Sequence, residues 1–207
     1  MKKARFIVID GIGGSGKTAL AKALCARIGR RALYTHEPGG APYAEKIRTV
    51  LLKGLGPVAN PLADFFLFWA ARAEHIRDRI APALRARRVV VSDRFDSSTF
   101  AFQVCGEKHS ELEALFWEAR EAALGTIVPD AYILLDLPVE VAATRRAKRA
   151  KVKDRFDERE AAFQKRVRAG FKRFARARSS RTYVVDANRP REAVEKEVWN
   201  IVRSTLR

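Results

Sequence analysis

The sequence is poor in cysteine, which limits both its redox chemistry and its metal chemistry. Only two of the 207 residues are cysteine, Cys25 and Cys105, and neither has the spacing of a metal-binding or CxxC motif. A disulfide-stapled secreted domain and a thiol-dependent enzyme are therefore not indicated. A reducing, cytoplasmic environment is the expected location.

Long apolar runs are also missing. The longest run, Phe65 to Ala71, is far shorter than the roughly 20 residues that a membrane-spanning helix needs. The first residues, Met1 to Arg5, lead directly into an apolar segment, which leaves no room for a signal peptide. We expect no membrane partner.

Acidic residues are in the minority, with 24 Asp and Glu against 41 Lys and Arg, which gives a net charge of +17. One explanation is a nucleic-acid surface, and the other is an enzyme that binds several nucleotide phosphates through arginine. The basic residues are spread over the helical patterns Arg77 to Arg88, Arg145 to Arg155 and Lys165 to Arg181, and not over a single-strand platform with interleaved aromatic residues. We favour the enzyme and expect no specific nucleic-acid partner, although polyanions should bind in low salt.

Apolar segments alternate with helical patterns along the whole chain. Nearly continuous apolar strands separated by helices predict a parallel sheet that is covered on both faces, and 207 residues suit a single α/β domain over residues 1–207. The predicted strands are Arg5 to Asp10, Leu33 to Thr35, Val89 to Ser92, Ala131 to Asp136 and Thr182 to Asp186. The predicted helices are Thr18 to Arg27, Tyr43 to Leu52, Leu62 to Arg87, Ser110 to Leu124, Val139 to Ala150, Phe156 to Arg178 and Arg191 to Leu206.

The segment Gly11 to Thr18 completes the pattern G-x-x-x-x-G-K-[ST] directly after the apolar run Phe6 to Ile9. Glycines at these positions let the backbone N–H groups point inward onto phosphate oxygens. Lys17 can reach the β- and γ-phosphates, and Thr18 offers a hydroxyl to Mg²⁺ at a helix start that favours anions. The pattern predicts a nucleoside triphosphate site with Mg²⁺, and a glycine-rich turn without a ligand is the alternative.

Polar residues follow the other predicted strands. Ligands of such sheets gather beyond the carboxyl ends of the strands, where Thr35 to Gly40, Asp93, Arg94 and Asp136 should meet the phosphate-binding loop. Arg94 could bridge phosphate oxygens, while Asp93 could hold Mg²⁺ through water or orient the arginine. A surface ion pair is the alternative for these two residues.

Several motifs together resemble the thymidylate kinase family of P-loop nucleoside monophosphate kinases. The resemblance covers nearly the whole chain and implies a P-loop NTPase fold with a five-stranded parallel sheet, transfer of the γ-phosphoryl group of ATP to dTMP, and a homodimer. It also implies a small mobile flap, the LID, at about residues 145–156. The motifs are Phe6 to Gly11, Glu37 to Gly40, Phe68 to Arg72, Asp93 to Phe95 with Ser98, Ala101, Phe102 and Gln103, then Pro129-Asp130, Asp154 to Phe156 and Phe163 to Arg168.

The resemblance assigns a stacking role on thymine to Phe68 and a bond to a base carbonyl to Arg72. Residues four apart share a helix face, so a ring and a donor could be presented together, although the apolar stretch Phe65 to Trp69 could equally be core. Phe102 and Gln103 would lie near the sugar and base. The implied dTMP-binding residues are Asp10, Glu37, Pro38, Phe68, Arg72, Arg94, Ser98, Phe102 and Gln103.

Phosphoryl transfer needs positive charge near the moving group, and an arginine-rich LID could supply it. Within this run we favour Arg149 as catalytic and Arg155 as an ATP contact, and leave Arg145 and Arg146 open. Together the implied catalytic residues are Lys17, Asp93, Arg94 and Arg149, and the metal ligands Thr18 and Asp93. The implied ATP-binding residues are Gly11, Gly13, Gly14, Ser15, Gly16, Lys17, Thr18, Ala19 and Arg155.

Two residues depart from the family pattern. His36 stands where many relatives carry arginine, and Gly13 stands where relatives usually carry Asp or Glu, so the contacts to phosphate and sugar are in question. These departures suggest a catalytically silent relative as one alternative. The other two alternatives are another nucleoside monophosphate or deoxynucleoside kinase and a basic nucleic-acid-binding P-loop NTPase.

Overall fold

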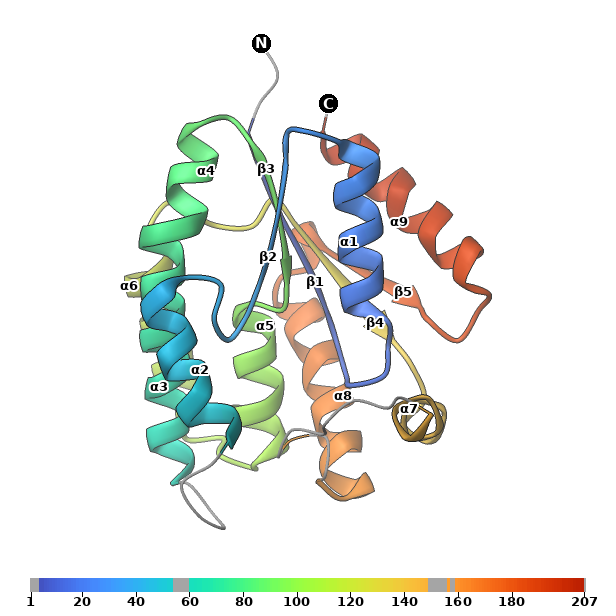
Figure 1. The fold of residues 1–207 in the computed structure, drawn as a ribbon. Helices are drawn as coiled ribbons and strands as arrows, with labels where there is room; N and C mark the ends of the chain where they lie inside the picture. The colour runs from blue at the N-terminus through green and yellow to red at the C-terminus, as the bar shows by residue number, and fades with distance from the viewer. Residues whose placement is uncertain (1–3, 54–59, 149–155, 157–158, 207) are drawn as a thin grey trace.

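The computed structural model describes residues 4–53, 60–148, 156 and 159–206. Five parallel strands form one sheet in the order β2-β3-β1-β4-β5 (Figure 1). All five predicted strands are present, which confirms the predicted parallel sheet. The strands are β1 Arg5–Gly11, β2 Ala32–His36, β3 Val89–Asp93, β4 Ala131–Asp136 and β5 Thr182–Asp186.

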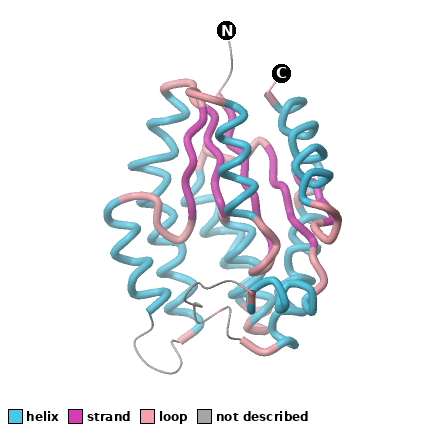
Figure 2. Tube along the Cα trace, turned by 45° about the vertical axis from the view of Figure 1, so that its right-hand side comes forward, coloured by secondary structure: helices cyan, strands magenta, loops and turns pink. Residues whose placement is uncertain are grey.

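Helices connect successive strands and account for most of the remaining chain (Figure 2). The α-helices are α1 Lys17–Ile28, α2 Pro42–Lys53, α3 Pro61–His75, α4 Ala81–Arg85, α5 Asp96–Thr99, α6 Leu112–Leu124, α7 Val139–Ala147, α8 Ala161–Ala177 and α9 Arg191–Thr205. Two π-helices, η1 Ile76–Ile80 and η2 Phe100–Gly106, and a 3-10 turn, Ser179–Arg181, complete the set.

Three predicted helices differ clearly from the observed ones, and the helical segments α5 and η2 are additional to the predicted set. The predicted helix Val139 to Ala150 ends at Ala147. The predicted helix Leu62 to Arg87 is a helical run in which η1 separates α3 from α4. Pro82 explains the interruption, because proline has no N–H to donate and its ring crowds the preceding turn. The predicted helix from Phe156 begins instead at Ala161, after Glu160.

The alternating residues of the central strands divide the core into two layers. Ile7 and Ile9 of β1 belong to a buried cluster with α1 and α9, whereas Phe6 and Val8 belong to another with α3 and α6. Successive side chains of a strand point to opposite faces, so both faces of the sheet are buried. The predicted covering of both faces by helices is confirmed.

The helical segment after β3 packs closely against α8. A Cβ atom at Gly170 would lie 2.9 Å from Cα of Ala101 and 2.8 Å from Cβ of Cys105, so only glycine permits this approach. The contact brings η2 beside α8, and residues of both elements then face one cavity.

The parallel register aligns the carboxyl ends of the strands. Ile9 pairs with Asp93, and Asp93 pairs with His36 on the other side. The loops that follow β1, β2 and β3 therefore emerge at one edge, as predicted. No helix in the described part of the chain is both long and apolar enough to cross a membrane.

Candidate active site

The phosphate-binding loop joins β1 to α1 and lies against α7. Gly14 has a φ of +87°, and a Cβ atom there would lie 2.6 Å from the Ala142 carbonyl oxygen, so glycine is required twice over. Lys17 is buried, and its Nζ donates to the Ile12 carbonyl at 2.9 Å. The ammonium group is thus held inside the curl of the loop, where a phosphate would meet it.

Thr18 and Asp93 form the contact between the loop and the end of β3. The Thr18 hydroxyl donates to the Asp93 carboxylate, which is itself buried. Both groups present oxygen, the ligand that Mg²⁺ prefers, and Mg²⁺ in nucleotide sites takes only one or two protein ligands beside water and phosphate. No cluster of three or more His, Cys, Asp or Glu suited to a metal occurs among the described residues.

Arg94 is held in a strained conformation directly after β3. Its φ is +74°, a left-handed value that side chains other than glycine rarely adopt. Its Nη1 donates to Asp10 Oδ1 at 3.1 Å, to the Gly11 carbonyl at 3.0 Å and to Ser98 Oγ at 2.9 Å. Three acceptors fix one end of the guanidinium, and this end faces the loop.

Asp10 is the fully buried anchor of this arrangement. Besides Arg94, it accepts hydrogen bonds from the hydroxyls of Ser97 and Ser98 and from the Gly11 N–H. Burial raises the pKa of Asp10, an effect that the positive charges of Arg94 and Lys17 oppose. Asp10 therefore orients Arg94 and does not itself line a cavity among those described.

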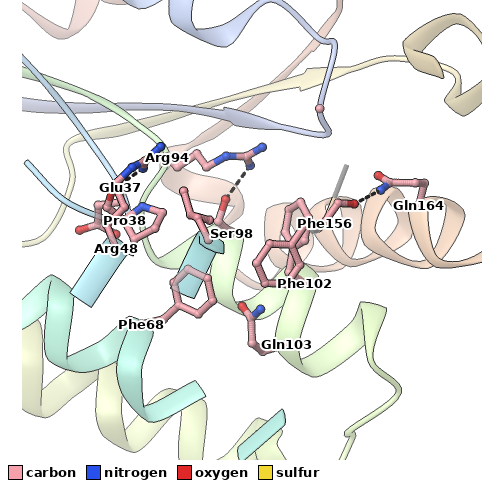
Figure 3. A pocket seen from close by; sticks show the side chains of 12 residues that line it. Glu37, Pro38, Arg48, Phe68, Arg94, Ser98, Phe102, Gln103, Phe156 and Gln164 are labelled. Carbon is pink, nitrogen blue, oxygen red and sulfur yellow. Dashed lines mark hydrogen bonds between the residues drawn. The ribbon is translucent and has the colours of Figure 1, made fainter. Parts of the chain in front are cut away.

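A first cavity of about 90 Å³ lies between α2, α3, η2 and α8 (Figure 3). Phe68 and Phe102 project into it, Gln103 lies below them, and Arg94 and Glu37 lie toward the sheet. A ring surface beside a few polar groups suits a planar base with polar edges. The lining residues are Gly13, Glu37, Pro38, Arg48, Leu52, Phe68, Arg94, Ser98, Phe102, Gln103, Phe156 and Gln164.

Arg72 does not line this cavity and is 1% exposed. Its Nη2 lies 2.7 Å from Glu37 Oε2 and donates to Thr99 Oγ1 at 3.1 Å. The guanidinium carbon Cζ lies over the Trp69 ring, 4.5 Å from the ring centroid. Its Nη1 is buried and has no hydrogen-bond partner within the described residues. Arg72 is therefore not exposed beside Phe68 as helix spacing alone implies, but it retains one unused donor.

Gly13 and His36, the two residues that depart from the family pattern, each lie beside a charged side chain. Arg146, at the end of α7, donates from Nη1 to the Gly13 carbonyl at 2.9 Å. His36 Nε2 lies 3.4 Å from a Glu45 carboxylate oxygen on α2. Arg48, also on α2, donates to the Pro38 carbonyl at 2.5 Å and brings a cation to the first cavity.

A second cavity, of about 250 Å³, lies on the other side of the phosphate-binding loop. Arg145 reaches it from α7 and donates to the Ala187 carbonyl at 3.1 Å, and Arg189 and Arg191 reach it from the segment after β5. Basic and small residues around a loop of this kind suit a polyphosphate and its nucleoside. The lining residues are Gly14, Ser15, Gly16, Ala19, Leu20, Leu135, Arg145, Ala187, Arg189, Arg191, Val194 and Glu195.

Comparison with known proteins decides the family. The family profile described as "Thymidylate kinase" matches residues 9–198 of the chain. The chain belongs to the thymidylate kinase family. The resemblance drawn from the motifs is thereby confirmed, and the chain is a kinase, a phosphotransferase that binds nucleotides.

Relatives in this family match along almost their whole length. Thymidylate kinase of Thermomicrobium roseum is 42% identical over 205 residues, which are 98% of this chain and 96% of the relative. Thymidylate kinase of Chromobacterium violaceum is 43% identical over 197 residues, which are 91% and 89% of the two chains. The crystal structure of thymidylate kinase from Ehrlichia chaffeensis superposes with a TM-score of 0.77 at 28% identity and covers 97% of this chain and 99% of that chain.

Most residues expected from the thymidylate kinase motifs lie around the two cavities. The first cavity takes Gly13, Glu37, Pro38, Phe68, Arg94, Ser98, Phe102 and Gln103, and the second takes Gly14, Ser15, Gly16 and Ala19. Arg149 and Arg155, the two LID residues that we favoured, lie outside the described residues. What each residue binds stays a prediction.

The motifs missed several lining residues. Arg189 and Arg191 follow β5, so the rule that ligands gather at carboxyl ends would have found them had it been applied to the fifth strand. Arg48 is a single polar residue on an amphipathic helix, and nothing in the helical pattern distinguishes it from a solvated face. Gln164 lies within the motif Phe163 to Arg168, but no site role was assigned to it.

Proposed function

We propose that the first cavity binds dTMP, the second binds ATP, and the γ-phosphoryl group passes between them at the phosphate-binding loop. The observation that carries this assignment is the position of the loop: Gly13 lines the first cavity, and Gly14, Ser15 and Gly16 line the second. Two nucleotides in these cavities would meet end to end at one wall. The products are ADP and dTDP, because the bond between the β–γ bridging oxygen and the γ-phosphorus breaks while a dTMP phosphate oxygen forms the new bond.

Catalysis in this proposal depends on alignment and on positive charge. Lys17 brings a full positive charge to the transferring group, and Arg94 holds the dTMP phosphate in line with it. Thr18 would ligate Mg²⁺, with Asp93 binding it through water, and a bound Mg²⁺ neutralises phosphate charge. No covalent intermediate is needed.

The LID would add further positive charge near ATP. We propose that residues 145–156 close over ATP, with Arg149 toward the γ-phosphoryl group and Arg155 on the ATP side. Arg146 supports this proposal. It lies near the start of the segment and donates a hydrogen bond to the Gly13 carbonyl of the phosphate-binding loop. A single domain over residues 1–207 would then contain all of the machinery.

The dTMP assignment depends on the base end of the first cavity. Phe68 offers a ring for stacking, which is worth on the order of 1–3 kcal/mol per base. Arg72 Nη1 and Gln103 Nε2 are both buried donors without partners in the described residues, and a thymine carbonyl would accept from such donors. Phe102 is 8% exposed beside them and would occupy space needed by a ribose 2′-hydroxyl.

We further propose a cytoplasmic homodimer. Four large apolar side chains on α2 and α3 are exposed: Tyr43 by 56%, Val50 by 44%, Leu62 by 43% and Phe66 by 51%. Exposed apolar groups on two adjacent helices favour association with a second copy. Light scattering should give about twice the 23.3 kDa chain mass, and Phe66→Glu should reduce it to the mass of the monomer. A monomeric native protein would contradict the homodimer.

The proposed cytoplasmic location is a separate point. Both cysteines, Cys25 and Cys105, are free, which agrees with a reducing compartment.

A coupled assay of ADP release tests the function. ATP should be consumed with dTMP, more slowly with dUMP, and hardly at all with dCMP, dGMP or AMP. A preference for one of the last three nucleotides would favour another monophosphate kinase. Turnover that appears only with DNA and falls steeply with salt would favour the nucleic-acid-binding alternative.

A further inference from the structure

Gln164 of α8 is almost fully buried beside the first cavity, with 2% of its surface exposed. Its Nε2 donates to the Phe156 carbonyl at 2.7 Å (Figure 3). A carbonyl can only accept, so this bond fixes the amide orientation and identifies Oε1 as the other terminal atom. Oε1 is buried and has no hydrogen-bond partner within the described residues.

The bond from Gln164 also positions an aromatic ring. The Phe156 ring centroid lies 5.7 Å from that of Phe102 and 6.0 Å from that of Phe68. Figure 3 shows Phe156 between Gln164 and the other two rings, on the side of the cavity away from Glu37. Holding the Phe156 backbone therefore holds one apolar wall of the cavity.

We propose that Gln164 is a specificity-determining residue whose Oε1 accepts a hydrogen bond from an N–H or O–H group of the bound nucleotide. The inference deepens the proposed function and rests on it for the identity of the nucleotide. A buried acceptor without a partner is costly, and in native proteins such groups nearly always find a partner. The acceptor is neutral and lone-paired, so it suits a hydroxyl or ring N–H and does not suit a phosphate oxygen.

In dTMP two groups have this chemistry, the 3′-hydroxyl of the sugar and the N3–H of the base. Two analogues separate them: 3′-deoxy-dTMP lacks the first donor, and N3-methyl-dTMP lacks the second. Removing the group that meets Oε1 should remove the part of the dTMP affinity that comes from this hydrogen bond. The other analogue should keep that part.

The test compares native protein with Gln164→Met, which keeps the length of the side chain and removes both polar atoms. Lys165→Met on the same helix is the matched control, because Lys165 is exposed and its Nζ only approaches Glu140 at 3.7 Å. Calorimetry gives Kd for dTMP and both analogues, and the ADP assay gives kcat/KM.

We expect Gln164→Met to bind dTMP about 3- to 10-fold more weakly, the range of one neutral hydrogen bond. For the analogue that lacks the donor, Gln164→Met should lose clearly less affinity than it loses for dTMP, because only the effect on the Phe156 wall is left, while Lys165→Met should match native protein throughout. An equal loss for dTMP and both analogues would mean that Gln164 acts only through the Phe156 wall and would overturn the inference, as would no loss at all.

Binding separates this inference from the proposed function. Native protein that binds dTMP without phosphorylating it would contradict the proposed function, yet the ratios of Kd would still decide the role of Gln164. Native protein that does not bind dTMP would overturn both. Thermal unfolding of each variant confirms that the compared proteins are folded.

Discussion

Thr35 Oγ1 lies 2.6 Å from Nε2 of His75 in the protein interior. His75 is fully buried, and its Nδ1 lies 3.0 Å from Glu37 Oε1, the carboxylate whose other oxygen pairs with Arg72. A histidine that meets a hydroxyl on one side and a carboxylate on the other holds that carboxylate in place. His75 thus positions Glu37, and through it Arg72, without lining the first cavity.

His75→Leu should reduce both stability and dTMP binding. Loss of a hydrogen bond to a buried charged group should cost about 1.5–3 kcal/mol of unfolding free energy, measured by urea titration. KM for dTMP should rise more than kcat falls, because Arg72 becomes less well held. His109→Leu is the control, since His109 is partly exposed and its ring pairs with the surface residue Glu111. Similar results for the two variants would show that His75 does not position Glu37 and Arg72.

Lys17→Ala should lower kcat by about 100- to 1,000-fold or more, because its charge would be lost where negative charge moves in the transition state. The fold and much of the dTMP affinity should be retained. Lys22→Ala on the exposed side of the same helix provides the comparison, and steady-state kinetics with circular dichroism provide the measurement. Near-normal turnover by Lys17→Ala would show that the catalytic site is elsewhere.

Arg72 should determine the choice between thymine and cytosine. A carbonyl on thymine would accept from the unused Nη1, whereas the amino group of cytosine would leave that donor unpaired. Native protein should therefore reject dCMP strongly but dUMP only modestly, since the thymine methyl is worth about 1–3 kcal/mol. Arg72→Met should narrow the ratio of kcat/KM between dTMP and dCMP. Equal use of dTMP and dCMP by native protein would rule out this role.

Activity should decline on acidification as Asp10 takes up a proton. Burial raises the pKa of Asp10, so its charge is lost at a higher pH than that of an exposed aspartate, and Arg94 then loses the charged one of its three acceptors. The same raised pKa means that Asp10 favours the folded state at low pH, an advantage lost as pH rises through the folded-state pKa. Asp10→Asn should be weakly active, and its profile of activity against pH should lack this decline in acid. If the activity of Asp10→Asn still declined in acid, another group would be responsible for the decline.

Cys25 should resist alkylation at ordinary pH. Burial raises the pKa of its thiol to about 11, although the nearby charge of Arg88 opposes the effect. Because only the thiolate reacts, iodoacetamide labelling of the native protein, followed by mass spectrometry, should be half-maximal near pH 11. In urea the midpoint should return toward that of an ordinary thiol. Equal midpoints in native and unfolded protein would contradict the burial effect.

Local patterns were enough to predict the fold and the phosphate-binding loop. The apolar strands are short, nearly continuous and separated by helices, so their residues alone predict a parallel sheet. The loop is equally local: Gly14 must adopt a positive φ and Lys17 must return into the curl, and both requirements act within a few residues of one another. Similar reasoning placed Asp93 and Arg94 at the same edge.

Only the tertiary structure decided which way the remaining polar side chains face. Arg72 follows Phe68 by one helical turn, yet it is buried because Glu37, 35 residues earlier, supplies the opposite charge. Gln164 reaches the first cavity only because Gly170 lets α8 approach η2. Helical periodicity specifies that a residue shares a face with its neighbours, but the partner of that face is set by how distant elements pack on the sheet.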